Sequence, residues 1–222
     1  KAQKKIDIFC LILICIGAGY FATIQGFDSL PMNADTLAPF EEAKSLIRNP
    51  ATHLFNIHVS RIPSIFPDIT INALLQLIHP KAGFLEIFSL YSWCTSSLFL
   101  LLATILTNEI RPSHHTFTAN SIKISLITIS LLNISHQFNI AYAHILTPVH
   151  HGGNVLNTIL LIILALKLLK KPKHRWLQAG FLSLIFLAAM SNKLSVFTAV
   201  GPIACIFIIH LQGHTRNKHL LQ

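Results

Sequence analysis

Residues 6–26 read IDIFCLILICIGAGYFATIQG, an apolar run whose one charged residue, Asp7, stands near its start. A helix needs about 20 apolar residues to cross the hydrocarbon core of a bilayer, so this run predicts a membrane-spanning helix. A cleaved signal peptide is the alternative, because KAQKK before an apolar stretch has that form. The length of the run and the further apolar runs behind it favour a retained span.

The rest of the chain has the same character. Hydrophobic residues make up 52% of the 222 residues and charged residues only 11%, whereas soluble domains contain roughly 25% charged residues. This composition excludes a disordered chain and an ordinary water-soluble globule. Further spans are predicted at residues 82–107, 122–143, 152–169, 176–190 and 194–211. We therefore expect an all-α integral membrane protein with about six transmembrane helices, forming one domain over residues 1–222.

The basic residues predict the orientation. With the N-terminus inside, the cytoplasmic segments contain 12 of the 17 Lys and Arg residues, as the positive-inside rule requires. A single span over residues 176–211 would put Arg216 and Lys218 outside, so six spans with both termini cytoplasmic are preferred. The net charge of +9 then reflects membrane topology, and nucleic acid is not expected as a partner.

The long first outer loop, residues 27–81, is expected to contain two short helices that lie in the membrane interface. The first is predicted from Pro39 to Arg48, because proline suits the first helical position and a basic residue suits the last turn. The second is predicted from Asp68, acting as the N-terminal cap, to Ile78. Neither helix is long enough to span.

Acidic and basic residues of the outer side are the candidates for chemistry. Asp35 follows the first span closely and is either a general base, a metal ligand or the cap of a turn. Arg61 either pairs with Asp68 or binds a phosphate through its forked donors. Glu86, near the outer end of the second span, either faces the bundle interior or a wet cavity, or forms a hydrogen bond to a neighbouring helix. Asp68 and Glu86 are thus possible supporting acids.

Two further positions are candidates for binding a phosphate. His150, His151 and Gly152 precede the fourth span, and a helix N-terminus favours an anion; an ordinary interfacial turn is the alternative. Lys193, in the turn before the last span, either binds a phosphate or extends to the lipid headgroups. No cofactor is required. A divalent metal held by the two histidines with a loop aspartate is the alternative, although adjacent histidines are not a recognised metal spacing.

Four short motifs on the predicted outer side resemble those of known membrane enzymes. They are NADT at 33–36, FPD at 66–68, HGG at 151–153 and SNK at 191–193. With the predicted topology, they resemble the N-terminal half of polytopic glycosyltransferases of the GT-C fold class. These enzymes have an N-terminal span, a large outer loop with an early catalytic aspartate, and membrane-parallel helices. The last three motifs are also similar to those of other bacterial multi-spanning proteins.

The resemblance implies transfer of a sugar from a polyprenyl-phosphate donor to an acceptor at the outer face of the bacterial inner membrane. Asp35 would be the base of an inverting reaction, and Arg61, Lys193 and the turn at 150–152 would bind the donor phosphate. Membrane lipid, the lipid-linked sugar and a second membrane protein are the implied partners. Family members usually have more spans and often a soluble C-terminal domain, so the sequence is either a fragment of a longer chain, a module that depends on a partner, or no enzyme at all. A non-catalytic assembly subunit or small transporter is the alternative.

Overall fold

The computed structural model describes residues 2–27, 34–49, 65–110, 117–137, 152–191, 200–201 and 203–204. The elements in these ranges are α1 (Ala2–Phe27), α2 (Ala34–Arg48), η1 (Ile65–Ile69), α4 (Thr70–Ile78), α5 (Phe84–Ile110), α6 (Phe117–Gln137), α8 (Gly152–Lys170) and α9 (Arg175–Ser191). All of them are helical, and the described residues contain no strand. The predicted all-α class is confirmed.

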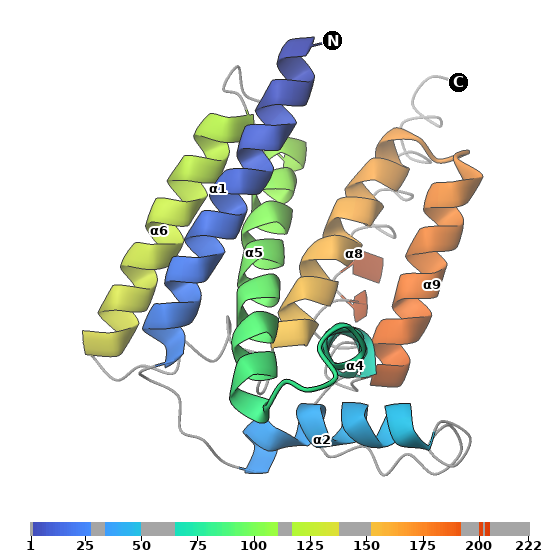
Figure 1. The fold of residues 1–222 in the computed structure, drawn as a ribbon. Coiled ribbons are helices and arrows are strands. Elements are labelled where there is room, and N and C mark those ends of the chain that lie inside the picture. The colour runs from blue at the N-terminus through green and yellow to red at the C-terminus, as the bar shows by residue number, and fades with distance from the viewer. Residues whose placement is uncertain are drawn as a thin grey trace, which may run out of the picture.

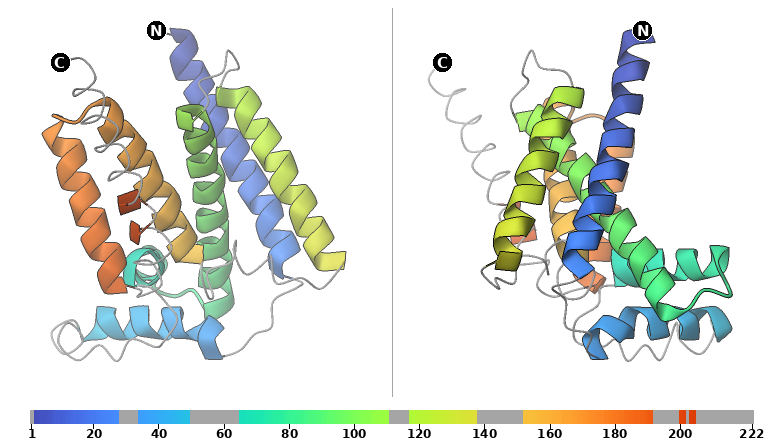
Figure 2. Two further views of the ribbon diagram at one scale, coloured as in Figure 1. Left: turned by 180° about the vertical axis from the view of Figure 1, so that it is seen from behind. Right: turned by 60° about the vertical axis from the view of Figure 1, so that its left-hand side comes forward.

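The long helices form a bundle. Helices α1, α5, α6, α8 and α9 lie side by side and alternate in direction along the chain, while α2 and α4 lie across one end of the bundle (Figures 1 and 2). We call this end the α2/α4 end. At the opposite end α1 begins and Lys170, Lys171, Lys173 and Arg175 lie where α8 turns into α9; we call it the basic end.

Three helical segments are long and apolar enough to cross a membrane, namely Lys5–Ile24, Phe84–Ile110 and Gly153–Lys170. By the same measure Phe117–Leu131 and Arg175–Ala189 are shorter apolar helices. The chain is therefore a helical membrane protein. The predicted number of six spans stays a prediction, because residues 194–211 lie almost entirely outside the described ranges.

The outer surface of the bundle suits lipid. Phe9 and Phe21 of α1 and Phe186 of α9 are 61%, 60% and 63% exposed. In water such a surface would be an aggregation hazard, whereas in a bilayer these side chains meet acyl chains.

Small residues bring α1 and α5 close together. Cys15 and Ala18 of α1 are buried in one cluster with Leu100 of α5. A Cβ added to Gly19 would lie 2.8 Å from the backbone nitrogen of Ser97, so only glycine allows this approach. Without a hydrophobic driving force in lipid, such close backbone packing is a main source of helix association.

The first loop helix differs from the prediction. It begins at Ala34, so Pro39 lies inside it and Asp35 is its second residue. Proline removes one backbone hydrogen bond of a helix, and α2 continues through it. The helix therefore begins five residues before the predicted start at Pro39 and includes Asp35.

The second loop helix also begins differently. Helix α4 starts at Thr70, and its N-terminal cap, Ile69, makes no side-chain cap hydrogen bond. Asp68 lies in the preceding turn of π-helix, η1. The prediction that Asp68 caps this helix is wrong, because its carboxylate makes contacts elsewhere in the bundle.

Helix α6 begins at Phe117, five residues before the predicted start at 122. The backbone N–H groups of Phe117 and Thr118 donate hydrogen bonds to the carboxylate of Asp7, at 3.2 and 3.3 Å, and the Thr118 hydroxyl donates to it at 2.5 Å. Asp7, from α1, thus satisfies the free N–H groups at the start of α6. Local sequence could not show this cap.

Candidate functional site

Asp68 is a buried acid at the α2/α4 end. Only 4% of the residue is exposed, and the Tyr91 hydroxyl of α5 donates a hydrogen bond to its Oδ1. The carboxylate also lies against Gly153, the second residue of α8: a Cβ added there would be 2.5 Å from each carboxylate oxygen. A phenol and the positive end of a helix therefore stabilise the buried negative charge.

Two buried asparagines hold the backbone around Asp68. The side-chain amide of Asn72 donates to the Asp68 carbonyl at 3.1 Å, and that of Asn157, from α8, donates to the Phe66 carbonyl at 2.9 Å. Asn72 and Asn157 are only 4% and 2% exposed. Since buried polar groups are costly unless they are paired, these bonds fix η1 between α4, α5 and α8.

The Asp68 site brings together two motifs that are far apart in the sequence. Asp68 comes from the FPD motif and Gly153 from the HGG motif. Tyr91, which supplies the hydrogen bond, was not among the predicted residues. Tyr91 could have been noticed because its span contains many serine and threonine residues. Polar residues within a span are expected where a helix faces polar neighbours. These contacts hold η1 in place, and the carboxylate of Asp68 is already engaged by Tyr91 and the start of α8.

Glu86 has a local role. Its carboxylate accepts a hydrogen bond from the backbone N–H of Gly83 at 3.1 Å, and the side chain is exposed. A glutamate that reaches back three residues to the cap position is half of a capping box. Glu86 therefore caps α5, and its role as a supporting acid stays a prediction.

The other predicted residues are described only in part. Asp35 is the second residue of α2, and its side chain lies outside the description. Gly152 begins α8 at the α2/α4 end (Figure 1). Arg61, His150, His151 and Lys193 lie outside the described residues.

A pocket of about 420 Å³ opens at the α2/α4 end. Its walls come from α2, from the end of α4 and from the turn before α5, and the cationic side chains Lys44 and Arg48 line it together with His79. Sequence reasoning missed this pocket. The available signal was the spacing of Lys44 and Arg48, which places them one helical turn apart on one face of α2.

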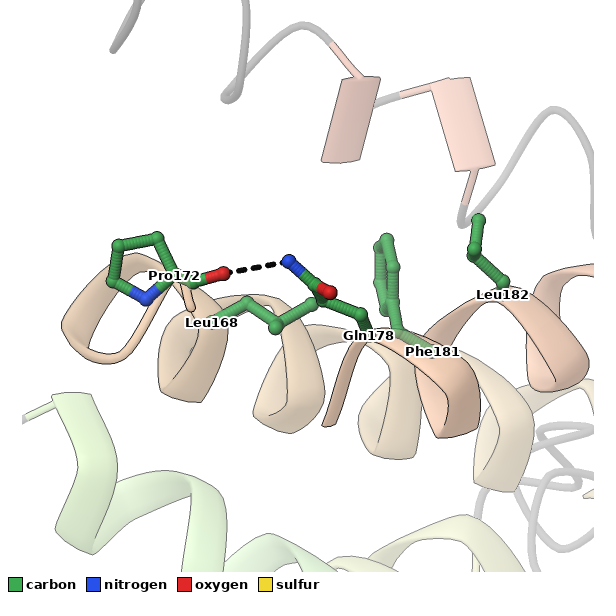
Figure 3. A pocket seen from close by; sticks show the side chains of 5 residues that line it. All are labelled: Leu168, Pro172, Gln178, Phe181 and Leu182. Carbon is green, nitrogen blue, oxygen red and sulfur yellow. Dashed lines mark hydrogen bonds between the residues drawn. The ribbon is translucent and has the colours of Figure 1, made fainter. Parts of the chain in front are cut away.

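A second pocket, of about 400 Å³, lies near the basic end between α8 and α9 (Figure 3). Leu168, Phe181 and Leu182 line it, and the Gln178 side-chain amide donates to the Pro172 carbonyl at 2.7 Å. None of the described residues that line it has a titratable side chain. It offers apolar contact without acid–base or charged groups, so the α2/α4 end is the better candidate for chemistry.

Within the described ranges, no three or more His, Cys, Asp and Glu residues form a group that could hold a metal ion. The histidine pair at 150–151 lies outside those ranges. The metal alternative therefore stays a prediction about residues that the description does not reach.

Comparisons of the chain with protein-family models, with curated proteins and with solved structures found no match.

Proposed function

We propose that the chain is a membrane glycosyltransferase-like protein that moves a sugar from a polyprenyl-phosphate donor to an acceptor hydroxyl. In this proposal it crosses the bacterial inner membrane six times, with both termini in the cytoplasm and the α2/α4 end outside. The concentration of lysines and an arginine at the opposite end of the bundle supports this orientation.

The observation that carries the proposal is the position of α2 and α4 across one end of the bundle (Figure 2). Leu74, Leu77 and Ile78 of α4 are 54%, 60% and 68% exposed. Helices that lie transversely and expose apolar side chains are suited to the membrane interface. A long-chain lipid carrier would reach the enzyme along such a surface.

In the proposed reaction Asp35 accepts the proton of the acceptor hydroxyl. The hydroxyl oxygen forms a bond with the anomeric carbon as the bond from that carbon to the phosphate oxygen breaks, with inversion. The electron pair leaves with the polyprenyl phosphate. Arg61, Lys193, His150 and His151, with the backbone at Gly152, would stabilise the charge of the departing phosphate.

Asp68 is not assigned a step in this reaction. Its carboxylate is buried, accepts the Tyr91 hydroxyl and lies against the start of α8. Its contribution would be to hold η1 and α4 against the bundle, and with them the surface along which the carrier moves.

The test is sugar transfer in membranes that contain the full chain and a labelled polyprenyl-phosphate-linked sugar. Loss of a general base typically lowers a rate by about 100-fold or more, and Asp35→Asn should do so. Glu41→Gln is the matched control, since Glu41 belongs to the same helix and is exposed; it should retain transfer. Equal transfer by Asp35→Asn and the parent chain would exclude Asp35 as the base. No transfer by the parent chain, together with a copurifying membrane protein, would favour the non-catalytic assembly subunit.

A further inference from the structure

The pocket at the α2/α4 end is held open by contacts between three helices. The Gln76 side-chain amide of α4 donates to the Phe40 carbonyl of α2 at 2.9 Å. The Phe40 ring meets the Phe84 ring of α5 edge to face, with 5.5 Å between centroids, and Ala43 behind it is completely buried. The walls are therefore fixed by packing before any ligand arrives.

The side chains that can donate hydrogen bonds to an anion come from α2 and from the residue that follows α4. Lys44 and Arg48 lie one turn apart on α2, and His79 follows the end of α4. None of the described residues that line the pocket is Asp or Glu. Arginine and lysine at this spacing present several N–H donors to one point, as phosphate binding requires.

Lys44 is only weakly held by its neighbours. Its Nζ lies 3.8 Å from Glu41 Oε1, and the two side chains are 38% and 53% exposed. Its Nζ also lies 5.6 Å from the centroid of the Phe40 ring. Exposed ion pairs contribute little to stability, so an anionic ligand can replace Glu41 as the partner of Lys44 at low cost.

Apolar side chains adjoin the cations. Ile47, which lies in sequence between Lys44 and Arg48, lines the pocket and is 36% exposed, and the ring of Phe84 lines it as well. A ligand that fills the site would meet charge and hydrocarbon together. The volume also lies within the range of small-ligand sites. An amphipathic ligand with an anionic headgroup fits both properties better than a free anion.

We propose that this pocket binds the phosphate headgroup of an anionic phospholipid of the bilayer. Lys44 and Arg48 donate to the phosphate oxygens, His79 lines the same pocket, and the acyl chains extend over Ile47. The site does not depend on the proposed sugar transfer, since none of its residues takes part in that reaction.

The experiment uses the full chain, purified in a neutral detergent, with bound lipid counted by native mass spectrometry. Phosphatidylglycerol is titrated, and phosphatidylcholine and inorganic phosphate are the comparison ligands. We expect saturable binding of phosphatidylglycerol. Each lost charge-assisted hydrogen bond should weaken binding by about tenfold or more, so Lys44→Gln/Arg48→Gln should lose most of it. Arg48→Lys keeps the positive charge but loses the paired N–H donors of the guanidinium. Its affinity for phosphatidylglycerol should lie between that of the parent chain and that of the double variant.

Lys81→Gln is the matched control. Lys81 is an exposed lysine in the turn before α5, between two residues that line the pocket, but it does not line the pocket itself. It should bind phosphatidylglycerol as the parent chain does. If Lys81→Gln and the double variant lost phosphatidylglycerol binding equally, the binding would depend on the general surface charge, and the proposed site would be wrong. Equal binding of phosphatidylcholine would overturn anion recognition. Displacement of the lipid by inorganic phosphate at similar concentration would overturn the lipid as ligand.

Discussion

Asp7 and Asp68 each lie at the start of a helix to which they do not belong, at opposite ends of the bundle. Asp7, half-buried at the basic end, accepts hydrogen bonds from the backbone N–H groups that begin α6. Asp68, almost completely buried at the α2/α4 end, lies against the start of α8 and accepts the Tyr91 hydroxyl. Both use the positive end of a helix to stabilise a carboxylate.

The two carboxylates differ in how far they are buried and in which groups surround them. Asp7 is bound by backbone N–H groups at the start of α6, and its side chain stays partly exposed. Asp68 needs a glycine in the helix and a buried phenol on a third element, because a buried charge is costly unless it is fully satisfied. The comparison predicts that stability depends more on the second site than on the first.

The largest effect is expected for Asp68→Ala. The substitution leaves the Tyr91 hydroxyl buried without its partner and removes the anion from the start of α8, so the free energy of unfolding should fall by about 3 kcal/mol. Unfolding in mixed micelles of neutral detergent and dodecyl sulfate measures this. Asp68→Asn keeps an acceptor oxygen and should lose less. A loss below about 0.5 kcal/mol in Asp68→Ala would show that the buried contact contributes no more than a surface residue.

An intermediate effect is expected for Gly153→Ala. The new Cβ would collide with both carboxylate oxygens of Asp68, and overpacking of this kind typically costs about 1–3 kcal/mol. Gly180→Ala is the control, because nothing lies within 4 Å of a Cβ at that position, and it should not destabilise the protein. Gly153→Ala should also cost less when Asp68 is already alanine. Independent, additive losses would mean that the two residues do not share one contact.

The smallest effect of the three is expected for Asp7→Ala. Loss of a side chain that caps a helix typically costs about 1 kcal/mol, and no buried donor is left unpaired in an apolar core. The same unfolding measurement applies, and Asp7→Asn should retain part of the stability. A loss larger than that of Asp68→Ala would reverse the comparison between the two ends.

The sequence predicted the class of protein and most helices because apolar length and composition are local properties. The helices of the bundle could be predicted from runs such as residues 6–26, whatever they pack against. The start of α6 could not, since Asp7 caps it from a position 110 residues earlier. The same limit explains the wrong prediction that Asp68 caps its own helix. An aspartate before a helix usually is a cap, and here the tertiary contacts with Gly153 and Tyr91 override that preference.

The candidate site was predicted less well than the fold. The FPD and HGG motifs were both singled out, but their contact requires knowledge of how α4 and α8 pack. The pocket lined by Lys44 and Arg48 depends on α2 lying against α4, which the hydrogen bond from Gln76 to Phe40 secures. Contacts between separate helices of this kind cannot be predicted from the spacing of apolar residues within one helix.

The contact of Asp68 with Gly153 has a consequence for how the chain is assembled during synthesis. Asp68 leaves the ribosome before α5 and long before α8, so neither its phenol nor its helix terminus exists when it emerges. The complete set of contacts around this carboxylate can therefore form only after α8 has been synthesised and has packed against η1.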